Sequence, residues 1–226
     1  TGLELAPEQV WGTTRFRATA PDGAPLSIEV IGRDATDARL FSKFWHALWY
    51  RDAGPGLALT RHQQLEHQAY ILLLTQQAGV AAGEVVIAGI GGSRSTAVLV
   101  LRELGGSAIV ELPPDRMTDS VLDEMWTTIR RLHDARLAHG QVEAGNLRLL
   151  ADGSIGLVDF ARASAVVPAE RMRLDDVALL ATTGAIVGAD RALAAAVRAL
   201  GESGLADLLP VLEPAALPRR LRKTAA

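Results

Sequence analysis

The sequence of 226 residues predicts an α+β fold with two lobes, and two observations lead to this prediction. In the first half, short runs rich in Val, Ile and Thr stand between Gly and Pro, a pattern typical of strands. In the second half, apolar residues recur at the three- and four-residue spacing of helices. Gly105 and Gly106 stand between the two parts, and their backbone freedom suits a hinge. We therefore expect a β-rich lobe over residues 1–104, a hinge at 105–107 and a helical lobe over 108–226.

The first lobe is expected to contain an antiparallel sheet. Residues 13–19 alternate along the strand, the letters "PDG" supply a turn, and residues 26–31 form a return strand with β-branched side chains. Two further strands are expected over residues 84–89 and 96–104, because both runs are apolar and a Gly- and Ser-rich turn separates them.

Two helices are expected between these strands. The first covers about residues 35–51, where Leu and aromatic side chains recur on one wide face that we interpret as core. The second covers about residues 61–78 and is closed by Gly79. The apolar face of the first helix consists of Leu40, Phe41, Phe44, Trp45, Leu48 and Trp49.

Helices dominate the expected second lobe. The segment 117–137 carries one apolar stripe, and Thr118 or Asp119 can cap its helix. The segment "NLRLLADGSIGLVDF" predicts a short hairpin, since two apolar runs flank the turn letters "ADG". The chain from Pro168 onward is expected to form three helices. They cover residues 169–188, 189–204 and 205–213.

The composition excludes several classes of protein. No apolar run reaches the roughly 18 to 20 residues that a membrane span requires. Because the chain has no cysteine, disulfides, thiolate metal sites and cysteine nucleophiles are excluded. The five histidines lack metal-ligand spacing, and a net charge of −3 without a broad basic face argues against a nucleic-acid partner.

Basic residues gather near the C-terminal end of the sequence. Two interpretations stand: a solvated tail, or a stretch on the cytoplasmic side of a membrane, just before a span beyond residue 226. The sequence begins with Thr1 rather than Met, and we expect it to be a piece of a longer protein. The basic residues of this end are Arg219, Arg220, Arg222 and Lys223.

The segment "HGQVEAGN" (139–146) is followed by a hairpin and then by "VDF". His139, Gly140 and Asn146 resemble the catalytic loop of the protein-kinase-like superfamily, in particular that of aminoglycoside and choline phosphotransferases and Rio kinases. In these families the loop reads His-Gly-Asp-x-x-x-x-Asn, so Gln141 stands where they have Asp. The resemblance covers roughly residues 10–200 and implies a bilobal protein-kinase-like fold.

The same resemblance assigns further positions. Asp159, in the Asp-Phe motif 159–160, falls on the metal-binding Asp of the superfamily, and Asp175 or Asp176 becomes a structural anchor. In the first lobe, Glu66 falls on the Glu that pairs with the phosphate-binding Lys. Glu29 stands where that Lys is expected, and no glycine-rich phosphate loop precedes it. We expect Arg33 or Arg102 to neutralise Glu29, and the sequence does not choose between them.

These substitutions predict a pseudokinase. The Gln141 amide cannot take a proton from a hydroxyl, and a missing general base costs about 10²- to 10⁴-fold in rate. At Glu29, repulsion of phosphates would replace attraction. No cofactor is therefore required, although Asn146 and Asp159, with Glu66, are the residues that would hold Mg²⁺ and ATP. Two alternatives stand: a nucleotide sensor without turnover, and a weak atypical kinase for a small molecule or lipid head group with Glu143 as base.

A longer phrase points to the parent protein. The segment "GRDATDARLFSKFWHALWYRDAGPG" resembles the kinase-like cytoplasmic domains of actinobacterial membrane proteins of the flippase-like or lysylphosphatidylglycerol-synthase-like kind. The resemblance implies a regulatory or docking domain on the cytoplasmic side of the plasma membrane. Its expected partner is the adjoining transmembrane region or a cytoplasmic protein.

Overall fold

A computed structural model describes four stretches of the chain. The helix expected at 35–51, the candidate partner Arg33 and the basic C-terminal residues lie outside them. The described residues are 3–6, 14–31, 61–91 and 96–211.

The chain divides into two compact units, and each is described by itself. Unit 1 consists of Thr1–Leu73 with Gly83–Glu103, and unit 2 of Leu74–Ala82 with Leu104–Ala226. Unit 1 holds most of the strand residues and unit 2 most of the helices, which makes the fold α+β as the sequence predicts. The sequence did not indicate that Leu74–Ala82 packs with the second unit.

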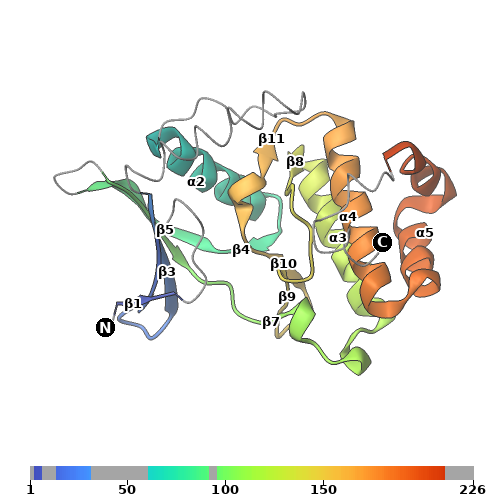
Figure 1. The fold of residues 1–226 in the computed structure, drawn as a ribbon, viewed down its shortest axis with the longest axis horizontal. Coiled ribbons are helices and arrows are strands. Elements are labelled where there is room, and N and C mark those ends of the chain that lie inside the picture. The colour runs from blue at the N-terminus through green and yellow to red at the C-terminus, as the bar shows by residue number, and fades with distance from the viewer. Residues whose placement is uncertain (1–2, 7–13, 32–60, 92–95, 212–226) are drawn as a thin grey trace. The chain divides into compact units, whose positions relative to one another are not determined.

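Unit 1 contains a five-stranded antiparallel sheet in the order β1-β2-β3-β6-β5 (Figure 1). The predicted hairpin is confirmed, since β2 and β3 pair across a turn in which Gly23 has a φ of 85°. The Asp22 carboxylate accepts a hydrogen bond of 3.1 Å from the Ala24 amide in this turn. The strands are β1 (Glu4–Leu5), β2 (Thr14–Thr19), β3 (Pro25–Ile31), β5 (Glu84–Gly91) and β6 (Thr96–Arg102).

One helix, α2 (Arg61–Gln77), packs on this sheet. Its residues Leu65 and Ala69, one turn apart on the same helix face, pack against Ala97 and Leu99 of β6 in a buried cluster. The helix predicted at 61–78 is therefore confirmed to within one residue of its end.

Strand β5 lies at an edge of the described sheet. Its register with β6 shifts between Val85 and Ile87, which leaves Val86 as a β-bulge. The side chains of Val86, Ile87 and Ile90 are exposed along this edge strand.

Unit 2 contains a four-stranded sheet in the order β4-β10-β9-β7. The predicted hairpin is confirmed as the antiparallel pair β9–β10, and β4 lies parallel to β10 on its other side. A separate antiparallel pair joins β8 to β11. The strands are β4 (Ala81–Ala82), β7 (Ser107–Ala108), β8 (Leu137–Ala138), β9 (Leu147–Leu149), β10 (Ile155–Leu157) and β11 (Ser164–Ala165).

The expected hinge glycine Gly106 lies close against the backbone of unit 2. Its φ is 85°, and a Cβ there would collide with the carbonyl oxygen of Leu149. Arg148 donates a hydrogen bond of 3.4 Å to the Gly106 carbonyl. Gly106 thus serves a close approach as well as a left-handed backbone, and motion about residues 105–107 stays a prediction.

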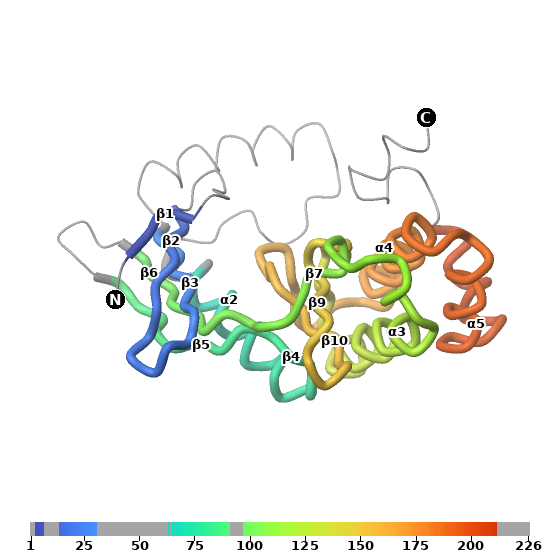
Figure 2. Tube along the Cα trace, turned by 90° about the horizontal axis from the view of Figure 1, so that it is seen from below, coloured from blue at the N-terminus to red at the C-terminus, as the bar shows by residue number. Residues whose placement is uncertain are grey.

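Three helices complete unit 2 and contact one another: α3 (Asp119–Asp134), α4 (Ala169–Val187) and α5 (Ala189–Ala206) (Figure 2). The Thr118 hydroxyl caps α3 by accepting from the Val121 amide at 3.4 Å. Instead of a third predicted helix, α5 continues past a non-helical Gly201 to Ala206 and a short 3₁₀ turn follows at Leu209–Val211. The buried stripe of α3 includes Leu122, Met125, Trp126, Ile129 and Leu132. Other 3₁₀ turns are Ile109–Glu111, Pro114–Arg116 and Phe160–Arg162.

Among the helices of the described stretches, none combines the length and apolar character needed to cross a membrane.

Candidate functional site

The loop between β8 and β9 is held by one buried carboxylate. The Asp175 side chain, on α4, is 1% exposed, and its two oxygens accept from two successive backbone amides of the loop. The His139 amide donates at 2.6 Å and the Gly140 amide at 2.8 Å. Of the two residues proposed as anchor, Asp175 is therefore the one that binds the loop backbone. Bonds from N–H groups to a carboxylate are about twice as strong as neutral ones.

His139 is a buried residue that braces the loop. Its ring is fully buried, donates a hydrogen bond of 3.0 Å from Nε2 to the Val158 carbonyl, and meets the Phe160 ring edge-on with the ring centroids 4.9 Å apart. Burial lowers the pKa of His139 below its usual range, against the opposing effect of Asp175. The neutral ring therefore ties the loop to the segment that follows β10.

Gly140 is required by the geometry of the loop. Its φ is 74°, and a Cβ at this position would lie 2.6 Å from the carbonyl oxygen of Arg162. Both the backbone angle and the close approach exclude a side chain here. The His-Gly pair of the motif thus has a structural reason in this chain.

Gln141 stands at the centre of the loop with its amide engaged. Its Nε2 donates to the Glu143 carboxylate at 3.0 Å. The Asn146 amide donates to the Gln141 carbonyl at 3.0 Å, and the Asn146 backbone N–H donates to the Glu143 carbonyl at 2.8 Å. Asn146 is therefore a brace of the loop, and a half-buried carboxylate at Glu143 lies beside Gln141.

Asp159 follows β10 in a left-handed backbone conformation, with φ 63° and ψ 68°. Left-handed backbone is uncommon outside glycine, although Asp and Asn adopt it more readily than most residues. The backbone amide of the preceding residue, Val158, donates a hydrogen bond of 3.0 Å to the Asn146 carbonyl. This bond joins the segment that carries Asn146 to the segment that carries Asp159. An amide oxygen and a carboxylate are donors that Mg²⁺ accepts in proteins. Within the described stretches, no three His, Cys, Asp or Glu side chains form a cluster suited to a metal ion.

A second buried acid lies next to the loop anchor. Asp176 is 8% exposed, and the His133 ring of α3 lies between the two carboxylates. His133 Nε2 is 3.5 Å from Asp175 Oδ2, and His133 Nδ1 is 3.6 Å from Asp176 Oδ1. Burial raises the pKa of Asp176 to about 6, and the nearby Asp175 adds to this, while His133 and Arg173 oppose it. No sequence motif distinguished the anchor from its neighbour.

In unit 1, Glu29 is paired with a residue that the sequence analysis does not name, and the candidate partner Arg33 lies outside the described residues. The cation that meets it is Arg15, directly opposite in the β2–β3 register, with Nη2 3.0 Å from Oε1. Gln68 of α2 donates to the other carboxylate oxygen at 3.2 Å. Arg102 instead pairs with Asp22 at 2.8 Å and Glu84 at 3.3 Å, so its expected role at Glu29 was wrong.

Glu66, the expected partner of the phosphate-binding position, lies on α2 two residues before Gln68 and is exposed. The sequence contained a signal for Arg15, because a hairpin closed at "PDG" places residues 15 and 29 opposite one another. The contact of Gln68 had no such signal. Glu29 is therefore a member of a structural ion pair, and its charge is largely neutralised within unit 1.

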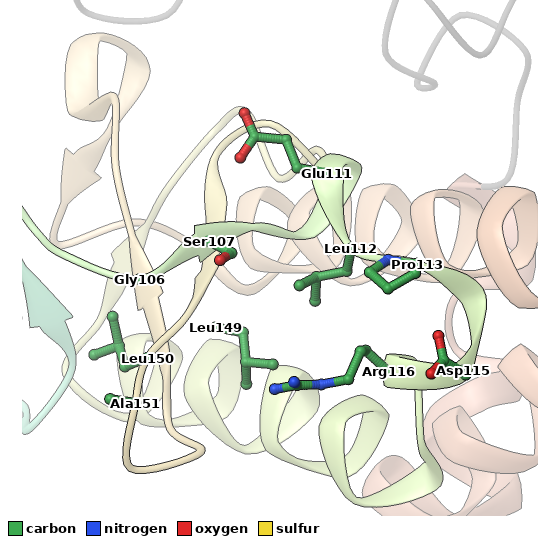
Figure 3. A pocket seen from close by; sticks show the side chains of 10 residues that line it. All are labelled: Gly106, Ser107, Glu111, Leu112, Pro113, Asp115, Arg116, Leu149, Leu150 and Ala151. Carbon is green, nitrogen blue, oxygen red and sulfur yellow. The ribbon is translucent and has the colours of Figure 1, made fainter.

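A pocket of about 620 Å³ opens on unit 2 (Figure 3). The Arg116 side chain extends toward Leu149, and Leu112 and Pro113 form the opposite wall (Figure 3). Charges of both signs line it, since Glu111 and Asp115 also contribute. None of the loop residues from His139 to Asn146 contributes to its wall.

No protein-family model matches the chain, and no curated protein matches it either.

Proposed function

We propose that this chain is a catalytically silent kinase-like module that acts by docking or regulation. Two arrangements support the proposal. In unit 1, one helix packs on a five-stranded antiparallel sheet. In unit 2, a His-Gly loop is anchored by a buried helix carboxylate and followed by a hairpin and an Asp-Phe pair. This is the order of parts that the kinase-like resemblance implies.

The observation that carries the proposal is the side chain at position 141. Phosphoryl transfer in kinase-like proteins needs a carboxylate here to orient the hydroxyl and accept its proton. Gln141 has no basic group, and its amide is already hydrogen-bonded to Glu143 at 3.0 Å. Glu143 is the nearest acid that could serve instead. As the acceptor of that bond, its carboxylate is partly occupied by a loop contact.

The position expected to hold the phosphate-binding lysine is altered as well. Glu29 occupies the expected lysine position, and Arg15 beside it is engaged by the Glu29 carboxylate at 3.0 Å. The described stretches contain no lysine, because Lys43 and Lys223 both lie outside them. Among the described residues of unit 1, Arg15, Arg17 and Arg102 are each paired with a carboxylate. Because Arg15 neutralises Glu29, phosphate is repelled less by Glu29 than the sequence alone suggests, whereas no lysine of the described stretches supplies the missing cation.

A nucleotide sensor without turnover is the second candidate, and the backbone at Asp159 favours it. A left-handed conformation at a residue other than glycine costs on the order of 1 kcal/mol and is common at ligand sites. Asp159 and Asn146 would then hold Mg²⁺ with nucleotide, with no chemistry at Gln141. Either function fits a domain on the cytoplasmic side of the plasma membrane, with the adjoining membrane region or a cytoplasmic protein as partner.

Thermal unfolding with and without ATP and Mg²⁺ tests the proposal. A silent docking module gives no shift in Tm and no ATP consumption. A sensor gives a rise in Tm that Asp159→Asn abolishes, because a ligand that binds only the folded state stabilises it. Asp152→Asn, an exposed acid in the β9–β10 turn, is the matched control and leaves any shift intact. Sustained ATP turnover that Asp159→Asn removes would refute both functions.

A further inference from the structure

A group of three titratable side chains lies next to the loop, and only Asp175 among them enters the proposed function, as the anchor of the loop. Asp175 and Asp176 are adjacent in sequence and both buried, and the half-buried His133 ring stands between their carboxylates. The two ring nitrogens lie 3.5 Å and 3.6 Å from the nearest carboxylate oxygens. These three side chains form the acid–histidine cluster.

The two acids of this cluster differ in what they bind. Asp175 accepts two backbone amides of the loop, at 2.6 Å and 2.8 Å. Asp176 Oδ1 is buried without a hydrogen-bond partner among the described residues, and so is Nε2 of His133. A buried carboxylate without a hydrogen bond is costly when ionised, whereas a protonated carboxyl can donate. The two unpartnered atoms, Asp176 Oδ1 and His133 Nε2, therefore indicate that the cluster can bind one more proton.

We propose that the acid–histidine cluster is a proton-dependent clamp on the His139–Asn146 loop. With one proton added, the cluster carries less buried negative charge, and Asp175 keeps its two bonds to the loop at lower cost. Without that proton, two neighbouring carboxylates remain buried with only the His133 ring between them. The loop is then held less firmly. The proton belongs to the coupled cluster rather than to one residue.

The direction of the pH dependence follows from Asp176. Burial raises its pKa from 3.8 to about 6, so between these two pH values the folded state holds a proton that the unfolded state has released. In the proposed clamp, opening of the loop releases the same proton. The stabilisation is fully present below about pH 4, falls as the pH rises through about 6, and is lost above that. Between about pH 5 and pH 7.5 this amounts to roughly a tenfold weakening of the closed loop.

Other charged groups near the cluster also affect how the stability of the loop depends on pH. Arg173, on the same helix as the acids, favours the ionised form of Asp176. His139, whose amide is clamped, acts in the opposite sense, because burial lowers its pKa and acid therefore disfavours its folded environment. Asp159 is close enough to affect the charge of His139. The effect of the cluster on loop stability is therefore measured as the difference between the pH profiles of wild type and of a variant without the Asp176 carboxylate.

Amide hydrogen exchange tests the clamp directly. Protection factors of the His139 and Gly140 amides are measured by NMR from about pH 5 to pH 7.5, in wild type and in Asp176→Asn. Protection factors remove the intrinsic pH dependence of exchange. We expect the wild-type protection, relative to the variant, to fall about tenfold over this range. The Ile129 amide, inside α3, serves as a probe of wider unfolding.

A second variant keeps the test decisive if Asp176→Asn folds poorly. His133→Gln retains both acids but removes the ring that lowers the pKa of Asp176, so it is expected to steepen the pH dependence. Parallel pH profiles of wild type and Asp176→Asn would overturn the proposal. So would an unchanged profile in His133→Gln. Neither result bears on ATP binding, so the proposed function is tested separately.

Discussion

Replacing Glu29 by Lys restores the residue that the kinase-like motif expects, and the structure predicts that unit 1 will not tolerate it. Glu29 is 7% exposed and is bonded to Arg15 at 3.0 Å and to Gln68 at 3.2 Å. Removing one partner of a buried pair costs about 3–5 kcal/mol. A lysine adds repulsion from Arg15, which at about 4 Å and an effective dielectric constant of about 20 amounts to roughly 4 kcal/mol before relaxation.

The expected loss from Glu29→Lys is therefore at least about 3 kcal/mol, a large part of the roughly 5–15 kcal/mol typical of a folded domain. Urea unfolding followed by circular dichroism measures it, with exchange of the Leu99 amide as a local probe of the sheet. Glu84→Lys is the matched control. Glu84 also pairs with an arginine, at 3.3 Å, but its side chain is 66% exposed, so we expect a change below about 1 kcal/mol.

A charge exchange separates the ion pair from simple loss of packing. Arg15→Glu combined with Glu29→Lys keeps opposite charges opposite one another in the β2–β3 register. We expect the double variant to recover part of the stability that Glu29→Lys loses, which a double-mutant cycle quantifies. Wild-type stability of Glu29→Lys would refute this account of the pair. An equal loss in Glu84→Lys would refute it as well.

Two further predictions concern the loop. Gly140→Ala is expected to lower the free energy of unfolding by at least about 2 kcal/mol, because Gly140 has a left-handed φ of 74° and lies close to the Arg162 carbonyl. Gly145→Ala, in the same loop, is the control. A Cβ there meets no atom within 4 Å, so we expect stability to change by less than about 1 kcal/mol. Equal urea midpoints for the two alanine variants would contradict this. Asp175→Asn leaves a buried loop amide facing an NH₂ group, so we expect a loss of about 2–4 kcal/mol in urea unfolding and faster exchange of the His139 or Gly140 amide. Wild-type protection of both amides in this variant would show that the loop is held by other contacts.

The long elements of this fold could be predicted from local patterns. The α3 helix has a capping hydroxyl at Thr118 and an apolar stripe, and the β2–β3 hairpin has its turn letters, so each is specified by neighbouring residues. The short strands β4 and β7 could not be predicted in the same way. Each has two residues, and each forms only because distant residues of β10 or β9 pair with it.

Some residues of the candidate site could be predicted from the sequence, and others could not. The His-Gly pair and Asn146 were recognisable because the loop needs a glycine at φ 74° and an amide that reaches the Gln141 carbonyl. The choice between Asp175 and Asp176 was not recognisable, since both stand at the same point of one helix and only the direction of the side chain separates them. Arg15 was missed because Arg102, one of the two candidates, belongs to the strand on one side of β3, whereas the residue that pairs with Glu29 lies on β2, on the other side.

The bulge at Val86 has a consequence for handling the protein. An exposed outer strand with aliphatic side chains invites a second molecule to extend the sheet, which is a common beginning of aggregation. The register shift between Val85 and Ile87 breaks the regular row of free backbone groups that such an addition needs. Deleting Val86 would make the edge of β5 regular and allow a second copy of the chain to pair with it. In the described part of the sheet, this irregularity makes the addition of a second molecule at β5 less favourable.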